Sequence, residues 1–252
     1  MSQAVVSTLE AGSGTFASAL VPHESTPVDG WLWLSYDQLN LSFVNDVEPD
    51  GLHYGVVLIE SSAKGNKRPY HKQKLALLLS SQRHFAIEVQ DTGRPVRYLT
   101  TNGTYADALG EHIDRHGPVN AIVHAELELR KEIQPLVERG NVVLHRHIGW
   151  LTKPSWFEQS VGSNPPFRMD RFYRKVRHET GWLMEMGKPV GGKYSFDSEN
   201  RFPWKGDPLP PEPPQYESDE IDLEVERLVN TEFSSHPGVL DMSQLPTTAE
   251  DI

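Results

Sequence analysis

The chain has no cysteine among its 252 residues. This absence excludes disulfides, cysteine nucleophiles, thiolate zinc sites and any iron–sulfur cluster that cysteines of this chain alone would hold. The sequence also lacks an apolar run near the roughly 18 residues that a membrane span requires. Its first residues show neither the basic nor the apolar region of a secretory signal. We therefore predict a cytoplasmic protein that makes no membrane contact.

The net charge of the chain is −11. Basic residues are scarce in one segment only, and that segment accounts for the net charge. Residues 206–252 contain 12 acidic residues and a single basic residue, Arg227, whereas residues 1–205 contain 23 residues of each sign. The acidity belongs to the C-terminal segment, so it says little about which partners the rest of the chain binds.

Short apolar segments alternate with helical patterns between residues 31 and 150. The clearest helical pattern lies between Leu75 and Val89, where apolar residues recur at i, i+3, i+4 and i+7. Alternation of this kind is typical of βαβ units, and right-handed crossovers place helices on both faces of the sheet. The expected fold is α/β, a doubly wound, largely parallel five-stranded sheet followed by a helical and irregular linker region. Its strands are expected at residues 31–34, 54–59, 96–99, 120–124 and 142–144.

Composition divides the chain into four regions. We expect a disordered arm at residues 1–30, the α/β domain at 31–150, a helical extension at 151–205 and an acidic, proline-rich linker with a terminal helix at 206–252. The apolar residues of the terminal helix share one stripe, which consists of Ile221, Val225, Leu228 and Val229.

Polar residues follow the first and the fourth predicted strands. Asp37 and Gln38 follow the first, and residues 124–130 follow the fourth. Ligands of doubly wound sheets bind outside the carboxyl ends of the strands where the winding direction reverses, so these groups are expected to face one crevice. They could orient a planar or ribityl-bearing ligand there; alternatively, Asp37 only caps the segment after it. The glycine-rich motifs that bind dinucleotides and triphosphates do not occur.

Two other clusters each have two interpretations. His145 and His147 form a pair that could bind a metal with His124 or Glu126, or they are ordinary packing histidines, which we favour. The basic residues of segments 64–74 and 168–177 could contact phosphates of DNA, or they lie on solvated helix faces. We expect no metal site, no catalytic residue and at most weak or indirect contact with DNA.

Four stretches, taken in order, resemble the N-terminal half of the bacterial iron–sulfur photolyase/cryptochrome family, also called deoxyribodipyrimidine photolyase-related proteins. The last two stretches are the most specific. The four are residues 34–39 (LSYDQL), 71–86 (HKQKLALLLSSQRHFA), 169–174 (MDRFYR) and 181–201 (GWLMEMGKPVGGKYSFDSENR).

The resemblance implies a function for the whole family. Its members repair UV-induced (6-4) pyrimidine dimers by light-driven electron transfer from reduced FAD. They hold a lumazine antenna in the N-terminal α/β domain, and FAD with a 4Fe–4S cluster in a C-terminal helical half. This chain is accordingly expected to be an antenna-chromophore-binding domain with an interdomain linker, not catalytic alone, with FAD and the cluster only in the other half. The residues expected to bind the antenna are Asp37, Gln38, Glu60, Glu128 and Arg130.

The chain departs from the family pattern at three places. Tyr36 stands where the family usually has glycine, and its ring is expected to take pocket space. Leu129 replaces a tryptophan that would offer a stacking surface, and residues 61–68 are basic instead of acidic and apolar.

Two functions from other classes remain open. The chain could be a catalytically silent interaction protein that docks on a separate flavin-binding chain through the stripe of its terminal helix. It could also be a small-molecule enzyme that uses the crevice at Asp37 and Glu128.

Overall fold

The computed structural model describes residues 4–8, 14–20, 27–198 and 203–251. It contains two units, one formed by residues 1–147 and 213–252 and the other by residues 148–212. Within the described residues, no helix combines the length and the apolar character that crossing a bilayer requires.

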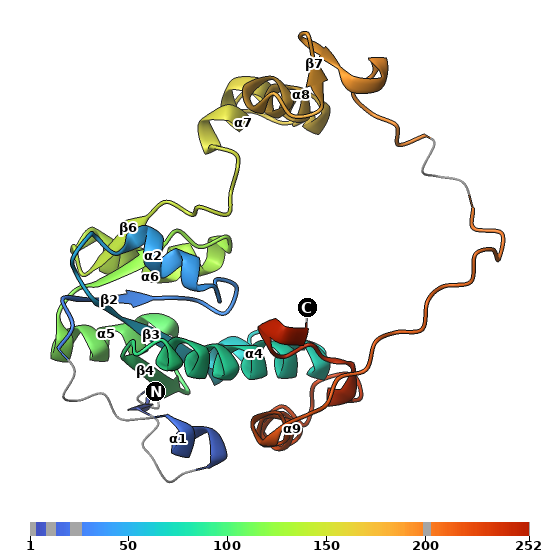
Figure 1. Cartoon of the computed structure of the whole chain (residues 1–252). Coiled ribbons are helices and arrows are strands. Elements are labelled where there is room, and N and C mark those ends of the chain that lie inside the picture. Colours follow the sequence, from blue (N-terminus) through green and yellow to red (C-terminus); the bar gives the residue numbers. More distant parts are fainter. Residues whose placement is uncertain (1–3, 9–13, 21–26, 199–202, 252) are drawn as a thin grey trace. The chain divides into compact units, whose positions relative to one another are not determined.

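A six-stranded sheet lies at the centre of the larger unit (Figure 1). Five strands run parallel to one another, and one is antiparallel at an edge. The doubly wound α/β fold is therefore confirmed, with one strand more than expected. In spatial order the strands are β1 (Val6–Thr8), β4 (Val96–Thr101), β3 (Tyr54–Ser61), β2 (Gly30–Trp33), β5 (Val119–Ile122) and β6 (Val142–His145).

Helices cover both faces of this sheet. The helices α2 (Leu41–Val47) and α4 (Lys72–Asp91) pack on one face, and α5 (Tyr105–His116) and α6 (Leu127–Glu138) pack on the other. Successive side chains of a strand point to opposite faces. In β2, Leu32 therefore joins the first core cluster, while its neighbours in sequence join the second.

The extra strand comes from the segment that we expected to be a disordered arm. β1 pairs with β4, and the short helix α1 (Thr15–Ala19) follows it. Phe16 is completely buried, and its ring lies 4.7 Å from that of Tyr98. One buried aromatic residue anchors α1 without producing any periodic pattern, which explains why composition predicted an arm.

The terminal helix belongs to the larger unit and not to a separate C-terminal region. α9 (Glu220–Glu232) packs along α4, and its Val225 and Val229 are completely buried in a cluster with Leu75, Phe233 and other residues. The predicted apolar stripe thus has a partner inside this chain. The expectation that it is free to dock on another protein is wrong.

The smaller unit consists of two helices and a short hairpin. Its elements are α7 (Pro154–Val161), α8 (Met169–Thr180), β7 (Met184–Glu185), β8 (Lys188–Pro189) and the 3-10 turn η1 (Val190–Gly192). Arg177 is the only buried residue among those described in this unit; its guanidinium donates to the carbonyls of Trp182, Leu183 and Tyr194. Residues 199–201, the end of the fourth family-like stretch, lie outside the described residues.

Candidate functional site

The strand order places the reversal of winding where the crevice was predicted, at the carboxyl ends of β2 and β5. These strands are neighbours, with Leu32 opposite Asn120 and Trp33 opposite Ala121. The helices that follow β2 and β3 cover one face, and those that follow β4 and β5 cover the other. The winding direction therefore reverses here, at the place where open α/β sheets bind ligands.

Gln38 lies inside this edge of the sheet and holds it together. Its side chain is 1% exposed. The amide nitrogen lies 3.4 Å from the carbonyl oxygens of Ile122 and Val123, and the amide oxygen accepts from the backbone N–H of Ser35. These bonds tie the loop after β2 to the end of β5, so they support a structural role for Gln38.

Asp37 and His124 are linked through one hydroxyl group. Ser35 donates its hydroxyl proton to Asp37 Oδ1 at 2.6 Å, and its oxygen lies 3.1 Å from His124 Nδ1. That geometry assigns the second hydrogen bond to an Nδ1–H donor. A serine nucleophile needs a histidine that accepts its proton. Here the proton points to the carboxylate, so the three residues do not form a catalytic triad.

We expect the free energy of unfolding to fall as the pH is lowered from 6.5 toward 4. Burial lowers the pKa of His124 to about 4 in the folded protein, whereas an unfolded histidine takes up a proton near pH 6.5. The unfolded state binds more protons in this window, so acid favours unfolding. His112, whose pKa burial lowers to about 3, adds to the effect.

Urea titrations across this pH window measure the slope. His124→Gln is expected to reduce it, because the neutral amide takes up no proton. His178→Gln, at an exposed position of α8, is the matched control for the loss of a histidine outside the core. If the slope in His124→Gln equals that of the wild type, His124 does not cause the pH dependence.

Three side chains from three strand ends meet above the crevice. Tyr36, after β2, donates its hydroxyl proton to Glu126 Oε2 at 2.8 Å. Lys64, in helix α3 (Ser62–Asn66) after β3, lies 2.5 Å from both carboxylate oxygens of Glu126, the residue before α6. We call this group the Tyr36–Glu126–Lys64 latch. It joins the ends of β2, β3 and β5.

The latch makes its bonds in the usual protonation states. Burial, followed by the hydrogen bond to Glu126, raises the pKa of Tyr36 far above its ordinary value, so the phenol keeps its proton. Burial raises the pKa of Glu126, but the hydrogen bonds from Lys64 and Tyr36 outweigh it, and the pKa is lowered. In the latch, therefore, the phenol of Tyr36 donates and the carboxylate of Glu126 accepts.

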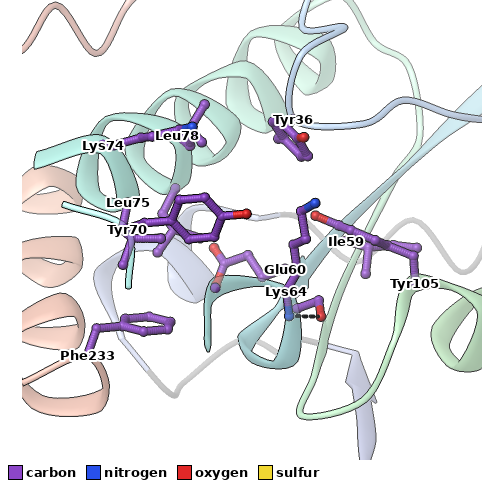
Figure 2. Close-up of a pocket in the computed structure, with 13 residues that line it drawn as sticks. Tyr36, Ile59, Glu60, Lys64, Tyr70, Lys74, Leu75, Leu78, Tyr105 and Phe233 are labelled. Carbon is purple, nitrogen blue, oxygen red and sulfur yellow. Dashed lines mark hydrogen bonds between the residues drawn. The ribbon is translucent and has the colours of Figure 1, made fainter. Parts of the chain in front are cut away.

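A small cavity lies beside the latch, bounded by β3, α3, α4 and the end of α9 (Figure 2). Its volume is about 80 Å³. Leucine, isoleucine and phenylalanine side chains form much of its wall, and its polar groups include Glu60 and Lys64. Three phenols also line it, from Tyr36, Tyr70 and Tyr105. The sequence analysis singled out Tyr36, Glu60 and the basic residue Lys64, but not Tyr70, Tyr105 or Phe233, because α9 and the loop before α4 reach the cavity from distant parts of the chain.

The five residues predicted to bind an antenna do not gather around this cavity. Glu60 lines it, but its carboxylate is engaged in a buried ion pair with Arg83 at 2.7 Å. Glu128 is partly exposed and pairs with Lys67 and with Arg68, each at 2.9 Å. Arg130 is exposed on α6. The contacts of Glu60 and Glu128 support structural roles.

The predicted basic and histidine clusters are also accounted for by contacts within the chain. In segment 64–74, Lys64 pairs with Glu126, and Lys67 and Arg68 pair with Glu128, so acidic residues neutralise much of its charge. In segment 168–177, Arg168 pairs with Asp170. Acidic partners in both segments favour the interpretation as solvated helix faces.

The histidine pair does not converge on one point with a third ligand. His145 Nε2 lies 2.8 Å from Asn120 Oδ1, and the ring of His147 packs edge-on against Phe43 at 4.9 Å. Within the described residues, the one group of three or more side chains with metal-ligating spacing consists of His84, Asp219 and Asp222. The last two form the N-terminal capping box of α9.

Comparison with known proteins identifies the family. The family described as deoxyribodipyrimidine photo-lyase-related protein matches residues 32–245. The chain belongs to this family. It is 30% identical over 224 residues to a (6-4) photolyase of Agrobacterium fabrum, a match that covers 85% of this chain and 44% of the photolyase. It is also 25% identical over 166 residues to the uncharacterized protein R852 of Acanthamoeba polyphaga mimivirus, a match that covers 61% of this chain and 84% of the viral protein.

This photolyase-related chain thus spans less than half the length of the (6-4) photolyase that it matches. The resemblance seen in the sequence is confirmed at the level of the family. The photolyase name belongs to that whole relative, so its activity is not transferred to this chain by similarity alone.

The residues at the crevice do not fit a bicyclic lumazine antenna. Pockets for ligands of that size usually have volumes of roughly 300–1,000 Å³, whereas the cavity beside the latch has about 80 Å³. A hollow of about 570 Å³ lies between β1, β4 and α9, and no residue from the ends of β2 or β5 lines it. Tyr36 is bonded across the crevice to Glu126. Leu129, which offers no flat ring for stacking, is 2% exposed and packs into the core. The side chains needed to enclose and stack on a planar ring are therefore otherwise engaged.

Proposed function

We propose that this chain is the N-terminal module of a photolyase-related protein, which supports light-driven repair of UV-damaged DNA only together with a flavin-binding half. The observation that carries this proposal is the family match over residues 32–245, combined with coverage of 44% of a (6-4) photolyase. The viral relative, most of whose length matches, supports the idea that such a module can make up most of a chain.

The chemistry of the family cofactors supports the same division of labour. An iron–sulfur cluster of the family type needs four thiolates, and this chain has no cysteine. A flavin supplies the electron-transfer chemistry, and the protein must hold and orient it. We assign FAD and the 4Fe–4S cluster to the partner half.

The smaller unit supports contact with such a half. Large apolar side chains are exposed on it, including Trp150, Phe167, Trp182 and Trp204, which are each 45–64% exposed. Aromatic side chains are enriched at protein–protein interfaces. The alternative of a silent interaction protein relied on the stripe of α9, which is buried against α4, so no observation now favours it over the proposal.

We expect the chain expressed alone to be colourless and to leave (6-4) lesions intact. Purification from cells supplied with riboflavin, followed by absorbance in the flavin band, measures FAD retention. Illumination of an oligonucleotide that carries one (6-4) lesion, with chromatography of the products, measures repair. The full-length Agrobacterium photolyase is the positive control. Tightly held FAD together with lesion repair by this chain alone would refute the proposal.

A further inference from the structure

We infer that the Tyr36–Glu126–Lys64 latch excludes a bicyclic antenna chromophore from the crevice at the ends of β2 and β5. The protein as folded therefore binds no such chromophore at that position, and the latch is what prevents it. The inference uses the proposed function only to choose the probe, because the family is the reason to test a lumazine.

The first step is the position of the tyrosine. Tyr36 is the third residue after β2, so it stands at the strand end where the crevice opens. Its ring is half-buried and its hydroxyl reaches Glu126, on the far side of the crevice before α6. A glycine at this position would leave backbone alone there. The phenol ring thus occupies space that a planar ligand would need.

The second step is the strength with which the ring is held. Glu126 accepts from Tyr36 at 2.8 Å and from Lys64 at 2.5 Å, and the side chains of Glu126 and Lys64 are only 25% and 17% exposed. Hydrogen bonds to charged groups are stronger than neutral ones, and partial burial reduces their screening by water. Lys64 Nζ also lies 5.8 Å from the centre of the Tyr36 ring, where the cation is attracted to the aromatic face.

The third step is that the latch joins separate elements. A chromophore that enters must displace the Tyr36 ring, and this breaks a bond to α6 that also positions Lys64 of α3. The cavity beside the closed latch has a volume of about 80 Å³, which is too small for a bicyclic ring system. A larger hollow of about 570 Å³ lies between β1, β4 and α9, and no residue of the latch lines it. Removal of the ring would join the crevice to the smaller cavity, which Tyr36 and Lys64 both line.

Titration of the full chain with 6,7-dimethyl-8-ribityllumazine, followed by fluorescence anisotropy, tests the inference. The wild-type chain is expected to show no saturable binding. Tyr36→Gly is expected to bind the lumazine with a Kd at least about tenfold lower than any value for the wild type. Glu126→Gln, which keeps the size of the side chain but removes the charge that holds Lys64, is expected to change the Kd in the same direction.

Glu111→Gln is the matched control. It removes a carboxylate of α5 that pairs with Arg115 at 2.8 Å and does not touch the latch, and it is expected to behave as the wild type. Circular dichroism establishes which variants are folded; should Tyr36→Gly not fold, Glu126→Gln decides. Equal affinity in the wild type and the folded latch variants, whether tight or undetectable, overturns the inference. The flavin experiment above is independent of this result, so the two proposals fail separately.

Discussion

Replacement of Arg83 by methionine is expected to lower the free energy of unfolding by about 3–5 kcal/mol, the usual cost of leaving one member of a buried ion pair without its partner. Arg83 is 3% exposed, and its Nε and Nη2 donate to the two carboxylate oxygens of Glu60 at 2.7 and 3.1 Å. Its Nη1 donates to Glu224 of α9 at 2.7 Å. Methionine fills similar space but leaves the buried Glu60 without its counter-charge.

This arginine connects four elements of the larger unit. Glu60 lies in β3 and accepts a hydrogen bond from Tyr98 of β4, and the guanidinium carbon of Arg83 lies 5.1 Å from the ring centre of Phe16 in α1. Its favourable contacts with Glu60 raise the pKa of Arg83 above its ordinary value in spite of burial, so it stays charged. Replacement of Arg83 should therefore weaken the packing of both α1 and α9 on the rest of the unit.

Guanidinium denaturation, followed by tryptophan fluorescence, measures this loss. Arg68→Met is the matched control, because Arg68 pairs with Glu128 in an exposed position and its removal should change stability little. Glu60→Gln in the Arg83→Met background should restore part of the stability, since a neutral amide needs no counter-charge. If Arg83→Met destabilises the protein no more than Arg68→Met does, the Arg83–Glu60 pair does not have the energetic cost of a buried ion pair.

Much of the fold was predictable because it depends on local patterns. Apolar segments alternate with helical ones, and this alternation alone indicated the parallel sheet and the neighbouring positions of β2 and β5. The strand β1 was not predictable in this way. It has three residues, lies at a sheet edge and owes its place to pairing with β4.

The docking of α9 left one signal in the sequence that we did not use. Residues 75–79 are Leu, Ala, Leu, Leu and Leu, so apolar side chains surround this turn of α4. A helix with one buried face needs only a stripe, and apolar residues all round indicate burial on more than one side. The second partner of α4 proved to be the stripe of α9.

The site was predictable in its place but not in its contacts. The strand order correctly placed Asp37 and Gln38 beside residues 124–130, because a general rule of wound sheets fixes that juxtaposition. Which polar group faces which depends on side-chain packing. The bonds from Tyr36 to Glu126 and from Glu60 to Arg83 join residues 90 and 23 positions apart, and no local pattern reports them.

Val225→Asp is expected to destabilise the protein by about 3 kcal/mol or more, because it places an unpaired carboxylate in a dry helix interface. Val225 is completely buried among apolar residues of α4, α9 and the segment after α9, such as Leu75 and Met242. The side chain of Leu223 lies on the same helix and is 40% exposed, so Leu223→Asp is the matched control and should change stability little. Denaturant titration compares the two variants.

A free docking face and a buried interface predict different results. If the stripe of α9 were open to another protein, both aspartates would face water. Both variants would then unfold at the same denaturant concentration as the wild type. The two variants differ in stability only because α9 packs on α4, which buries Val225 and leaves Leu223 partly exposed.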